Sequence, residues 1–243
     1  MKAVILAGGK GTRLLPYTTV FPKPLVPLGD RPILDILLRQ LHHHGFDSVF
    51  LSVGHLAELI QAYCDRVVAD SDLAGLEISY VREERPLGTA GALSLIPDLA
   101  GTFLVVNGDV LTTLDFRRLV QFHQETEACL TIALQPREAR LPLGAVELDG
   151  DMNVQRYREK PATEYLASMG IYVYDAAALR YLEAGVACDF PDLVHRLVAA
   201  GERVKGFVTD SFWLDIGNPE DYHRAQEEFS NRTSEFLPVP AEK

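Results

Sequence analysis

The sequence predicts an α/β fold in which a mixed, mainly parallel sheet is flanked by helices. In the first half of the chain, apolar runs of strand length alternate with segments whose apolar spacing suits helices, which is typical of βαβ units. In the second half, strand-like runs follow one another with little helix between them, which favours added antiparallel strands. With 243 residues the chain can bury one substantial core, so we expect a single domain over residues 1–243.

The first half supplies the predicted parallel strands and the helices that join them. We expect strands at residues 2–7, 48–53, 76–81 and 102–107. Helices are expected between them at residues 31–45, 55–65 and 88–96. Because crossover helices join parallel strands, most of this sheet should be parallel.

The second half is predicted to extend or cover the same sheet, with some antiparallel strands. Strands are expected at residues 128–135, 144–150, 153–160 and 167–175. Helices return at 176–185 and 190–201, and each ends at a glycine suited to a C-cap. The last segment, 229–243, is polar and contains prolines, so we expect a flexible tail. No hexapeptide repeat occurs, so no C-terminal β-helix is expected.

The composition is that of an ordinary soluble globular protein. Hydrophobic residues make up 47% and charged residues 23% of the chain, which argues against disorder. The net charge of −11 comes without a basic run, so nucleic acid is not an expected partner. Three widely spaced cysteines indicate reduced thiols. Neither a membrane span nor a secretion signal is predicted, so we expect a cytoplasmic protein.

A glycine-rich turn, GGKG at residues 8–11, follows the first predicted strand. The carboxyl edge of a parallel sheet is where α/β proteins bind ligands. Glycines permit positive φ and close approach, so backbone N–H groups in the turn can converge on phosphate oxygens. The spacing matches neither the P-loop nor the GxGxxG pattern, and a purely structural turn explains the glycines alone about as well.

Lys23 lies between two prolines in the segment FPKP. Proline fixes its own φ and restricts the residue before it, so Lys23 sits on a stiff arm with a fixed direction. A lysine held in this way loses little further entropy when it meets an anion. Taken alone, Lys23 is better explained as a solvated turn lysine. Beside the glycine turn it indicates a site for a small polyanion.

The same stretch closely resembles the signature of the sugar-1-phosphate nucleotidyltransferases. LAGGKGTRLLPYTTVFPKPLVPLGDRPIL is followed in the expected order by PLGTAGAL, VVNGD, REKP, MGIYVYD and WLDIGNPEDY. The resemblance is to short forms such as the mannose- and heptose-1-phosphate guanylyltransferases. It implies the Rossmann-like fold of nucleotide-diphospho-sugar transferases. It also implies a nucleotide-binding half (1–112), a sugar-binding half (113–228) and the tail (229–243).

The implied reaction transfers a nucleotidyl group from a nucleoside triphosphate to a sugar 1-phosphate and releases pyrophosphate. By resemblance, Arg13 engages the triphosphate and the departing pyrophosphate, and Lys23 steadies the transferred group. These two residues are the implied catalytic side chains. The residues implied in nucleotide binding are Leu6, Ala7, Gly8, Gly9, Lys10, Gly11, Thr12, Glu83, Pro86, Gly88 and Thr89.

Asp109 and Asp215 each follow an apolar run, at the predicted end of a strand. Two carboxylates from distant parts of the chain suit a hard cation that keeps several waters and bridges phosphates. By resemblance they are the Mg²⁺ ligands. A cation is needed because one pair of like unit charges about 4 Å apart costs about 4 kcal/mol near a protein surface. For Asp109 alone, a simple turn carboxylate is the alternative.

The resemblance implies that Asn107, Gly144, Glu159, Lys160 and Gly170 bind the sugar phosphate. Lys160 fixes the phosphate and Glu159 accepts hydrogen bonds from sugar hydroxyls. The two glycines bring backbone close to the sugar. An exposed Glu–Lys pair is the alternative for Glu159 and Lys160, so these roles depend mainly on the motif.

Glu83 lies where the family contacts the nucleobase, and Glu84 follows it. A carboxylate only accepts hydrogen bonds, and guanine offers adjacent N–H donors. This favours GTP with mannose- or heptose-1-phosphate. UTP or dTTP with glucose 1-phosphate stays open, because either glutamate alternatively faces water.

Two other classes of protein are alternatives. A non-catalytic regulatory protein that binds nucleotide-sugars would be expected to lose Arg13, Lys23, Asp109 or Asp215, and all four are present. A Rossmann dehydrogenase would need a different glycine spacing. The three histidines at 42–44 are not expected to bind a metal, because consecutive helical residues point in different directions. A homodimer is left open.

Overall fold

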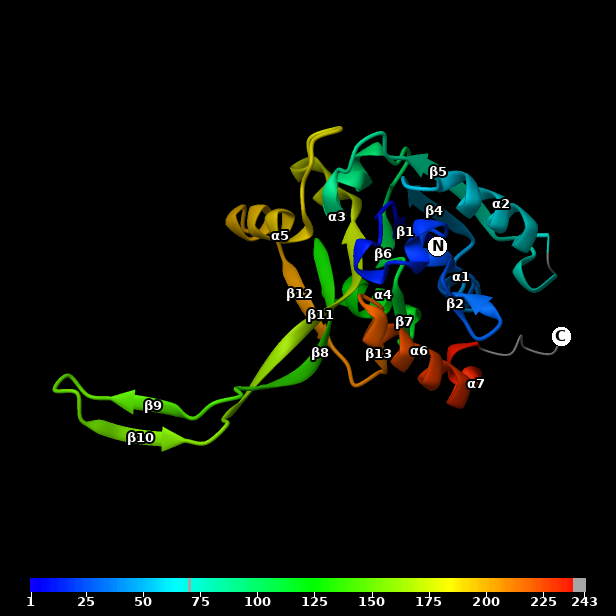
Figure 1. Ribbon diagram of the computed structural model, residues 1–243. Coiled ribbons are helices and arrows are strands. Elements are labelled where there is room, and N and C mark those ends of the chain that lie inside the picture. The colour runs from blue at the N-terminus through cyan, green and yellow to red at the C-terminus, as the bar shows by residue number, and fades with distance from the viewer. Residues whose placement is uncertain (70, 238–243) are drawn as a thin grey trace.

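A computed structural model describes residues 1–69 and 71–237 of the chain (Figure 1). At its centre lies a seven-stranded sheet with the strand order β12-β8-β11-β6-β1-β4-β5. These strands are β1 (Lys2–Ala7), β4 (Ser48–Val53), β5 (Glu77–Arg82), β6 (Thr102–Asn107), β8 (Leu130–Arg140), β11 (Ala162–Asp175) and β12 (Val204–Val208). The fold class is the one that the sequence predicts.

Within the described sheet only β11 runs against its neighbours. β1 pairs in parallel with β4 and β6, β4 with β5, and β12 with β8, whereas β11 is antiparallel to β6 and β8. The strands expected at 2–7, 48–53 and 102–107 are confirmed, and the strand expected at 76–81 lies one residue later. Four parallel strands therefore end together at one edge of the sheet.

Helices cover both faces of this sheet. On one face lie α1 (Ile33–His43), α2 (Ala57–Val67), α4 (Phe116–Glu125), α6 (Pro219–Asn231) and α7 (Thr233–Phe236). On the other lie α3 (Gly88–Gly91) and α5 (Phe190–Ala199). Successive strand residues point to opposite faces, so Ile5 joins the first apolar cluster and Val4 the second. None of the described helices is both long and apolar enough to cross a bilayer.

Shorter elements connect these layers. The pairs β2 (Pro27–Leu28) with β3 (Arg31–Pro32) and β7 (Val110–Thr112) with β13 (Trp213–Asp215) are antiparallel. Single 3₁₀ turns occur at Thr12–Leu14, Tyr17–Thr19, Lys23–Leu25, Ser71–Leu73, Ala92–Leu95 and Ala176–Tyr181. The helix expected at 88–96 is thus α3 plus a 3₁₀ turn, and the one expected at 176–185 is only a 3₁₀ turn. The helix expected at 190–201 is confirmed as α5.

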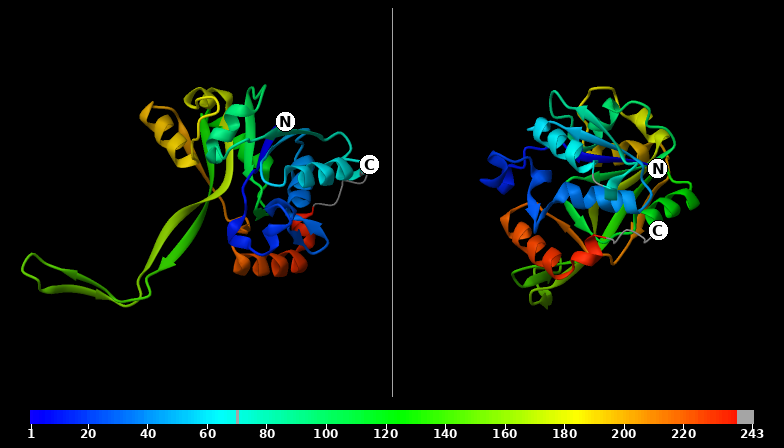
Figure 2. Two further views of the ribbon diagram at one scale, coloured as in Figure 1. Left: turned by 45° about the horizontal axis from the view of Figure 1, so that its top comes forward. Right: turned by 90° about the vertical axis from the view of Figure 1, so that its right-hand side faces the viewer.

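Strands β8 and β11 continue past the sheet as a two-stranded projection, in which Arg140 pairs with Ala162. The hairpin of β9 (Ala145–Leu148) and β10 (Val154–Arg158) completes it. We call residues 136–166 the arm, and Figures 1 and 2 show it standing away from the body of the molecule. The expectation that this segment extends or covers the central sheet is wrong. Among the described strands, β9 and β10 pair only with each other.

The chain beyond α6 is ordered as far as it is described, contrary to the flexible tail expected from residue 229. Phe229 is 2% exposed and Phe236 is fully buried, and both belong to the main apolar core. Phe229 lies on α6 and Phe236 on α7, and the polar residues between them face solvent. The polar composition of this segment therefore did not reveal its two core positions. Residues 238–243 lie outside the described part of the chain.

Candidate functional site

A cavity of about 580 Å³ lies at the edge where β1, β4, β5 and β6 end. Open α/β sheets bind ligands at this edge, and the volume suits a nucleotide-sized molecule. Its lining comes from four loops that are far apart in the sequence. The predicted residues that line it are Leu6, Gly8, Gly9, Lys10, Glu83, Pro86, Gly88, Thr89, Asn107 and Asp109.

The glycine turn is held by contacts that leave no room for a side chain at Gly11. Gly11 has φ of +62°, and a Cβ there would lie 2.9 Å from the Thr18 methyl and 3.0 Å from Lys23 Cβ. The Thr18 hydroxyl donates to the Gly11 carbonyl at 2.8 Å. Ala7 is buried at the end of β1, and Thr12 begins the next 3₁₀ turn, so neither side chain lines the cavity. The turn therefore brings its backbone directly against Lys23.

Lys23 forms an ion pair with Asp109, which lines the cavity. Lys23 is 9% exposed, between the buried Pro22 and Pro24. Its stiff proline setting thus holds a cation in the interior of the site, as the sequence predicts. A lysine this buried is seldom a solvated turn residue, because burying a charge is costly unless it is paired.

Asp109 and Asp215 are neighbours in space because β7 pairs with β13. Residue Asp215 lies opposite Val110, and the Ile216 amide donates to the Asp109 carbonyl at 3.0 Å. Partial burial and the nearby Asp109 carboxylate raise the pKa of Asp215, while Lys23 and Arg13 oppose the rise. A charge arrangement of this kind is typical of a site that receives a cation.

Arg13 completes the group from the other side. A Cβ built on Gly217 would lie 3.3 Å from Arg13 Nη1 and 3.6 Å from Asp215 Oδ2. Glycine at this position therefore leaves room for the guanidinium beside the carboxylate. Arg13 is largely exposed and able to turn toward a ligand. The four side chains expected to carry the chemistry thus meet at one place.

Two buried oxygens at this place have no hydrogen-bond partner among the described residues. They are Oδ1 of Asp109 and Oδ1 of Asn107. Gly170 packs against the same asparagine, because with its φ of +69° a Cβ would lie 2.6 Å from Asn107 Nδ2. Buried polar atoms without partners are costly unless a ligand satisfies them. These two buried oxygens can therefore accept a hydrogen bond from a ligand or coordinate a cation.

Glu83 anchors the loop after β5 rather than pointing freely at a base. Its Oε1 accepts from the Ser52 hydroxyl at 2.7 Å, and its Oε2 accepts from the Leu87 amide at 3.1 Å. These bonds give Glu83 a positioning role that the sequence did not indicate. Glu84 lines the same cavity, is exposed, and makes no hydrogen bond among the described residues.

The loop around Gly88 is fixed by the segment before α5. A Cβ on Gly88, whose φ is +75°, would lie 2.7 Å from the Cys188 carbonyl oxygen. The amides of Ala90 and Gly91 donate to that oxygen at 3.0 and 2.8 Å. The Thr89 hydroxyl accepts from the Phe190 amide at 2.9 Å. The loop expected to face the base is therefore rigid, and its glycine is required by close backbone packing.

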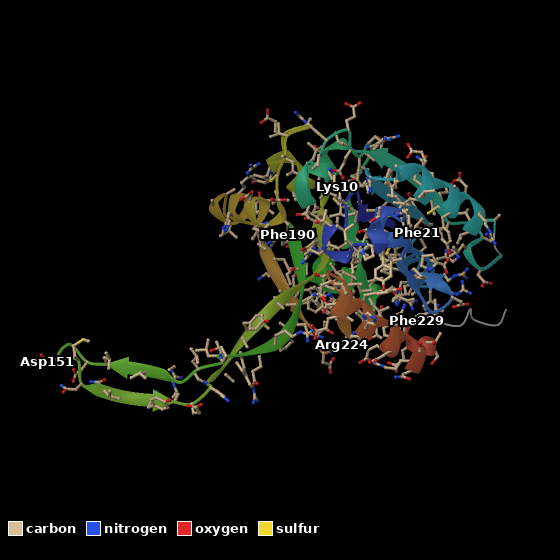
Figure 3. The ribbon with its side chains drawn as sticks, in the orientation of Figure 1. Lys10, Phe21, Asp151, Phe190, Arg224 and Phe229 are labelled. Carbon is tan, nitrogen blue, oxygen red and sulfur yellow. The ribbon has the colours of Figure 1, made fainter. Side chains whose placement is uncertain are left out.

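Three predicted sugar-phosphate residues are not brought to the cavity by their own chain. Gly144, Glu159 and Lys160 lie on the arm, where the Tyr157 hydroxyl donates to Glu159 at 3.0 Å. None of them lines the cavity. Figure 3 shows Asp151, at the far end of the arm, well away from Lys10 at the glycine turn. The structure thus places these three residues away from the cavity, and their assignment to the sugar phosphate stays a prediction.

Four further residues line the cavity that the sequence analysis did not select. They are Gly54, His55, Arg82 and Arg85. Gly54 follows β4 just as Gly8 follows β1, and the two glycines touch, since a Cβ on Gly54 would lie 2.9 Å from the Gly8 carbonyl oxygen. The rule that sites lie after parallel strands could have found these positions.

The histidine run and the cysteines lie elsewhere. His44 packs edge-on against Phe116, and burial lowers the pKa of His44 to about 4. The three cysteines are buried and unbonded. A second cavity of about 490 Å³, with His123 and Cys129 in its lining, contains none of the predicted site residues. Over the described residues, no three His, Cys, Asp or Glu side chains are grouped to hold a metal.

Curated relatives are similar over nearly the whole chain. A UTP-glucose-1-phosphate uridylyltransferase of Synechocystis is 35% identical over 99% of this chain and 66% of its own length. A mannose-1-phosphate guanylyltransferase of Mycobacterium tuberculosis is 34% identical over 91% of this chain and 62% of its own. The chain thus spans about two thirds of these relatives. A D-glycero-alpha-D-manno-heptose 1-phosphate guanylyltransferase of Aneurinibacillus thermoaerophilus is 30% identical, over 95% of this chain and 99% of its own.

Solved structures share the fold. HddC from Yersinia pseudotuberculosis, complexed with GMP-PN, superposes with a TM-score of 0.71 at 28% identity and covers 94% of this chain and 99% of its own. A putative glucose-1-phosphate thymidylyltransferase from Bacillus anthracis gives a TM-score of 0.74 at 23% identity, over 100% of this chain and 98% of its own, which shows the fold alone. The nucleotidyl transferase family model matches residues 2–232. With the glycine turn, the buried lysine and the paired aspartates all in place, the chain belongs to the nucleotidyl transferase family.

Proposed function

We propose that this protein transfers a nucleotidyl group from a nucleoside triphosphate to a sugar 1-phosphate. The observation that carries the proposal is the meeting of Arg13, Lys23, Asp109 and Asp215 beside the glycine turn, with Asp109 in the lining of the cavity. These side chains come from four separate segments. Their convergence supports a site in which the positive side chains offset the charge of the substrate phosphates and the carboxylates hold a cation.

In the proposed reaction a phosphate oxygen of the sugar 1-phosphate forms a bond to the α-phosphorus of the triphosphate. The bond from the α-phosphorus to the oxygen that bridges to the β-phosphorus breaks, and pyrophosphate leaves with that electron pair. The attacking phosphate has a second pKa of about 6, so it is largely dianionic at neutral pH and needs no general base. Catalysis is therefore mostly positioning and charge stabilisation.

Lys23 and Arg13 supply the fixed positive charge. Lys23 is held between the glycine turn and Asp109, so it meets the transferred phosphoryl group with little loss of entropy. Arg13 offers a planar pair of donors to the departing pyrophosphate. The exposed Lys10 at the turn and Arg85 on the loop after β5 add charge along the cavity for the triphosphate.

Asp109 and Asp215 would hold Mg²⁺, and the residues fit this ion. Oδ1 of Asp109 is buried and has no partner among the described residues, and partial burial together with the Asp109 carboxylate raises the pKa of Asp215. A divalent cation relieves the repulsion between the two carboxylates. Two carboxylates match an ion that takes its remaining ligands from phosphates and water. When bound, the ion offsets negative charge on the reacting phosphates.

The favoured substrates are GTP and mannose- or heptose-1-phosphate. A relative that is matched over 99% of its own length is named as a heptose 1-phosphate guanylyltransferase, and a neighbouring structure is complexed with GMP-PN. Glu84 is the exposed carboxylate in the cavity able to accept from adjacent guanine N–H donors, now that Glu83 is engaged by the loop. UTP or dTTP with glucose 1-phosphate is the alternative, supported by the uridylyltransferase relative.

A substrate matrix tests both levels of this proposal. GTP, UTP, dTTP, CTP and ATP are each combined with mannose-, heptose- and glucose-1-phosphate, and pyrophosphate release is measured with Mg²⁺ and with excess chelator. We expect release with one triphosphate well above the others, and only with Mg²⁺. Glu84→Gln should lower the rate with GTP more than the rate with UTP. Absence of turnover in every combination would favour the non-catalytic, nucleotide-sugar-binding alternative.

A further inference from the structure

The arm carries a concentration of exposed apolar side chains that its own chain leaves uncovered. Eighteen large apolar side chains in the described part of the chain are exposed, and nine of them lie within residues 136–166. They are Leu141, Leu143, Val146, Leu148, Met152, Val154, Tyr157, Tyr165 and Leu166. A patch of this density on a projecting element marks an interaction surface.

The arm by itself has few contacts that stabilise it. Beyond the sheet it consists of two strands only, and both of its faces are open to solvent. An isolated two-stranded ribbon is marginally stable at best in water. The strands nevertheless keep an unbroken register from Ser168 opposite Leu134 out to Ala162 opposite Arg140. Their direction is set by the sheet that they leave, and the arm stands away from the body of the molecule (Figure 1).

The arm holds two residues that the family resemblance assigns to the sugar phosphate, Glu159 and Lys160, and neither lines the cavity. Gly170 packs against Asn107 at the cavity, and β11 continues from there to Ala162, with a register shift between Ser168 and Tyr172. Eight residues at about 3.3 Å each place Ala162 about 26 Å along the strand from Gly170. Glu159 and Lys160 lie farther still, beyond the end of β11. A lysine side chain cannot span that distance.

Exposed apolar side chains also lie on the segment that joins the glycine turn to Lys23. Leu15, Tyr17, Val20 and Phe21 are all exposed apolar residues of the segment between the glycine turn and Lys23. Figure 3 shows Phe21 on the body of the molecule, far from the arm. Tyr17 packs against Tyr222 of α6, with ring centroids 5.4 Å apart, so this surface is anchored to the core.

We propose that two copies of this chain exchange arms, so that Glu159 and Lys160 of each copy serve the cavity of the other. The occupant is a second copy because the arm carries a sugar-phosphate motif, and only another molecule of this chain presents the cavity that the motif fits. Twofold exchange buries both arms against two identical surfaces and closes the assembly as a dimer. The catalytic part of this inference rests on the proposed function.

Complementation between two inactive variants tests the exchange. Lys160→Ala removes the arm lysine, and Asp215→Asn removes a cavity carboxylate. The two chains are co-expressed with different affinity tags, and the heterodimer is purified through both tags. If arms are exchanged, one cavity in the heterodimer has an intact aspartate and receives an intact lysine, whereas the other has neither. We expect about half the activity of the wild-type dimer, against almost none in either variant alone.

A matched pair of variants tests the arm surface without using activity. Val154 on the arm is 65% exposed and Val198 on α5 is 60% exposed, so the two differ in location rather than type. We expect Val154→Asp to weaken dimerisation at least tenfold, because it places a charge in the interface, and Val198→Asp to leave it unchanged. Sedimentation equilibrium distinguishes a chain of 26.9 kDa from a dimer of twice that mass.

The outcomes separate the exchange from the reaction. An inactive heterodimer, a fully active Lys160→Ala variant or a monomeric wild type would each overturn the exchange, the first in favour of an arm that closes over its own cavity. If wild type turns over no substrate in the matrix, the proposed function fails. Co-purification of the two tags and the effect of Val154→Asp then still decide whether arms are exchanged.

Discussion

The cavity and the arm differ in how much of each is held by its own chain. Around the cavity, Lys23 is paired with Asp109, Glu83 is tied to Ser52, and the glycines fit against backbone. On the arm, large apolar side chains face solvent and the strands have no third neighbour. The cavity, including Asn107 and Gly170, is therefore held in place by contacts within this chain. Glu159 and Lys160 instead stand on the arm.

This difference shows which part of the molecule is rigidly organised, namely the cavity. The cavity must hold carboxylates close to one another and a buried cation, which costs free energy and requires rigid support. The arm only has to present a short motif on a strand that projects. Variants in the cavity should therefore change chemistry strongly, whereas variants around the sugar edge should change binding.

The largest effect is expected for Asp215→Asn. Turnover should fall by at least about 10³-fold, because the change removes a proposed Mg²⁺ ligand of nearly identical shape. The raised pKa of Asp215 means that its carboxylate is disfavoured in the folded state. The neutral amide should therefore raise the melting temperature at pH 7 while activity disappears. Pyrophosphate release and thermal unfolding measure the two effects, and near-normal turnover would remove the metal assignment.

Variants of Lys23 and Lys10 should differ in which kinetic constant they change. We expect Lys23→Met to lower kcat about 10²- to 10³-fold with little change in KM for the triphosphate, because Lys23 acts on the transferred group. Lys10 is exposed on the cavity wall, so Lys10→Met should mainly raise KM, by no more than about tenfold. Steady-state kinetics on both variants make the comparison. Equal effects of Lys23→Met on kcat and KM would reassign it to ground-state binding.

Gly170→Ala tests the sugar edge of the cavity. Its φ of +69° costs an alanine about 1–2 kcal/mol, and the methyl would press on Asn107. We expect lower stability together with a KM for the sugar phosphate raised about tenfold. Gly201→Ala is the control, because Gly201 has φ of +76° with nothing near its Cβ, so it carries the same strain without the contact. A similar KM change in both variants would contradict a role for Gly170 at the sugar.

The smallest expected effect is a pH dependence of stability that arises in the body of the molecule and not in the arm. Burial lowers the pKa of His44 to about 4, so the folded state keeps this imidazole neutral where the unfolded chain, with an ordinary pKa near 6.5, binds a proton. Stability should therefore fall as pH is lowered from about 6.5 to about 4, and His44→Gln should flatten that slope. Urea unfolding at several pH values measures it. An unchanged slope in His44→Gln would assign the dependence to other groups.

Much of the body could be predicted from local patterns. The strands around Val4, Phe50 and Val105 read as short apolar runs because they are covered on both faces, and such runs are visible in any sequence. The glycine turn and the proline-held lysine were likewise readable. Helices α6 and α7 were hidden because only a few of their residues, such as Phe229 and Phe236, are apolar and buried.

The role of Glu83 and the shape of the arm were not readable in this way. Glu83 bonds to Ser52, thirty-one residues away, and no local pattern reports a contact of that range. The strands of the arm alternate like ordinary strands, so periodicity alone assigned them to the central sheet. Which neighbour a strand has is decided by the whole topology.

By itself the sequence determined the parallel core, the glycine turn and the fixed Lys23, because each depends on backbone preferences and burial within a few residues. The two aspartates were selected through the family resemblance. Tertiary structure alone decided that Asp109 and Asp215 meet, since that follows from β7 pairing with β13 across a hundred residues. It also decided that the motif of Glu159 and Lys160 stands on a projecting ribbon. A long-range strand pairing sets where such residues lie, and no local interaction encodes it.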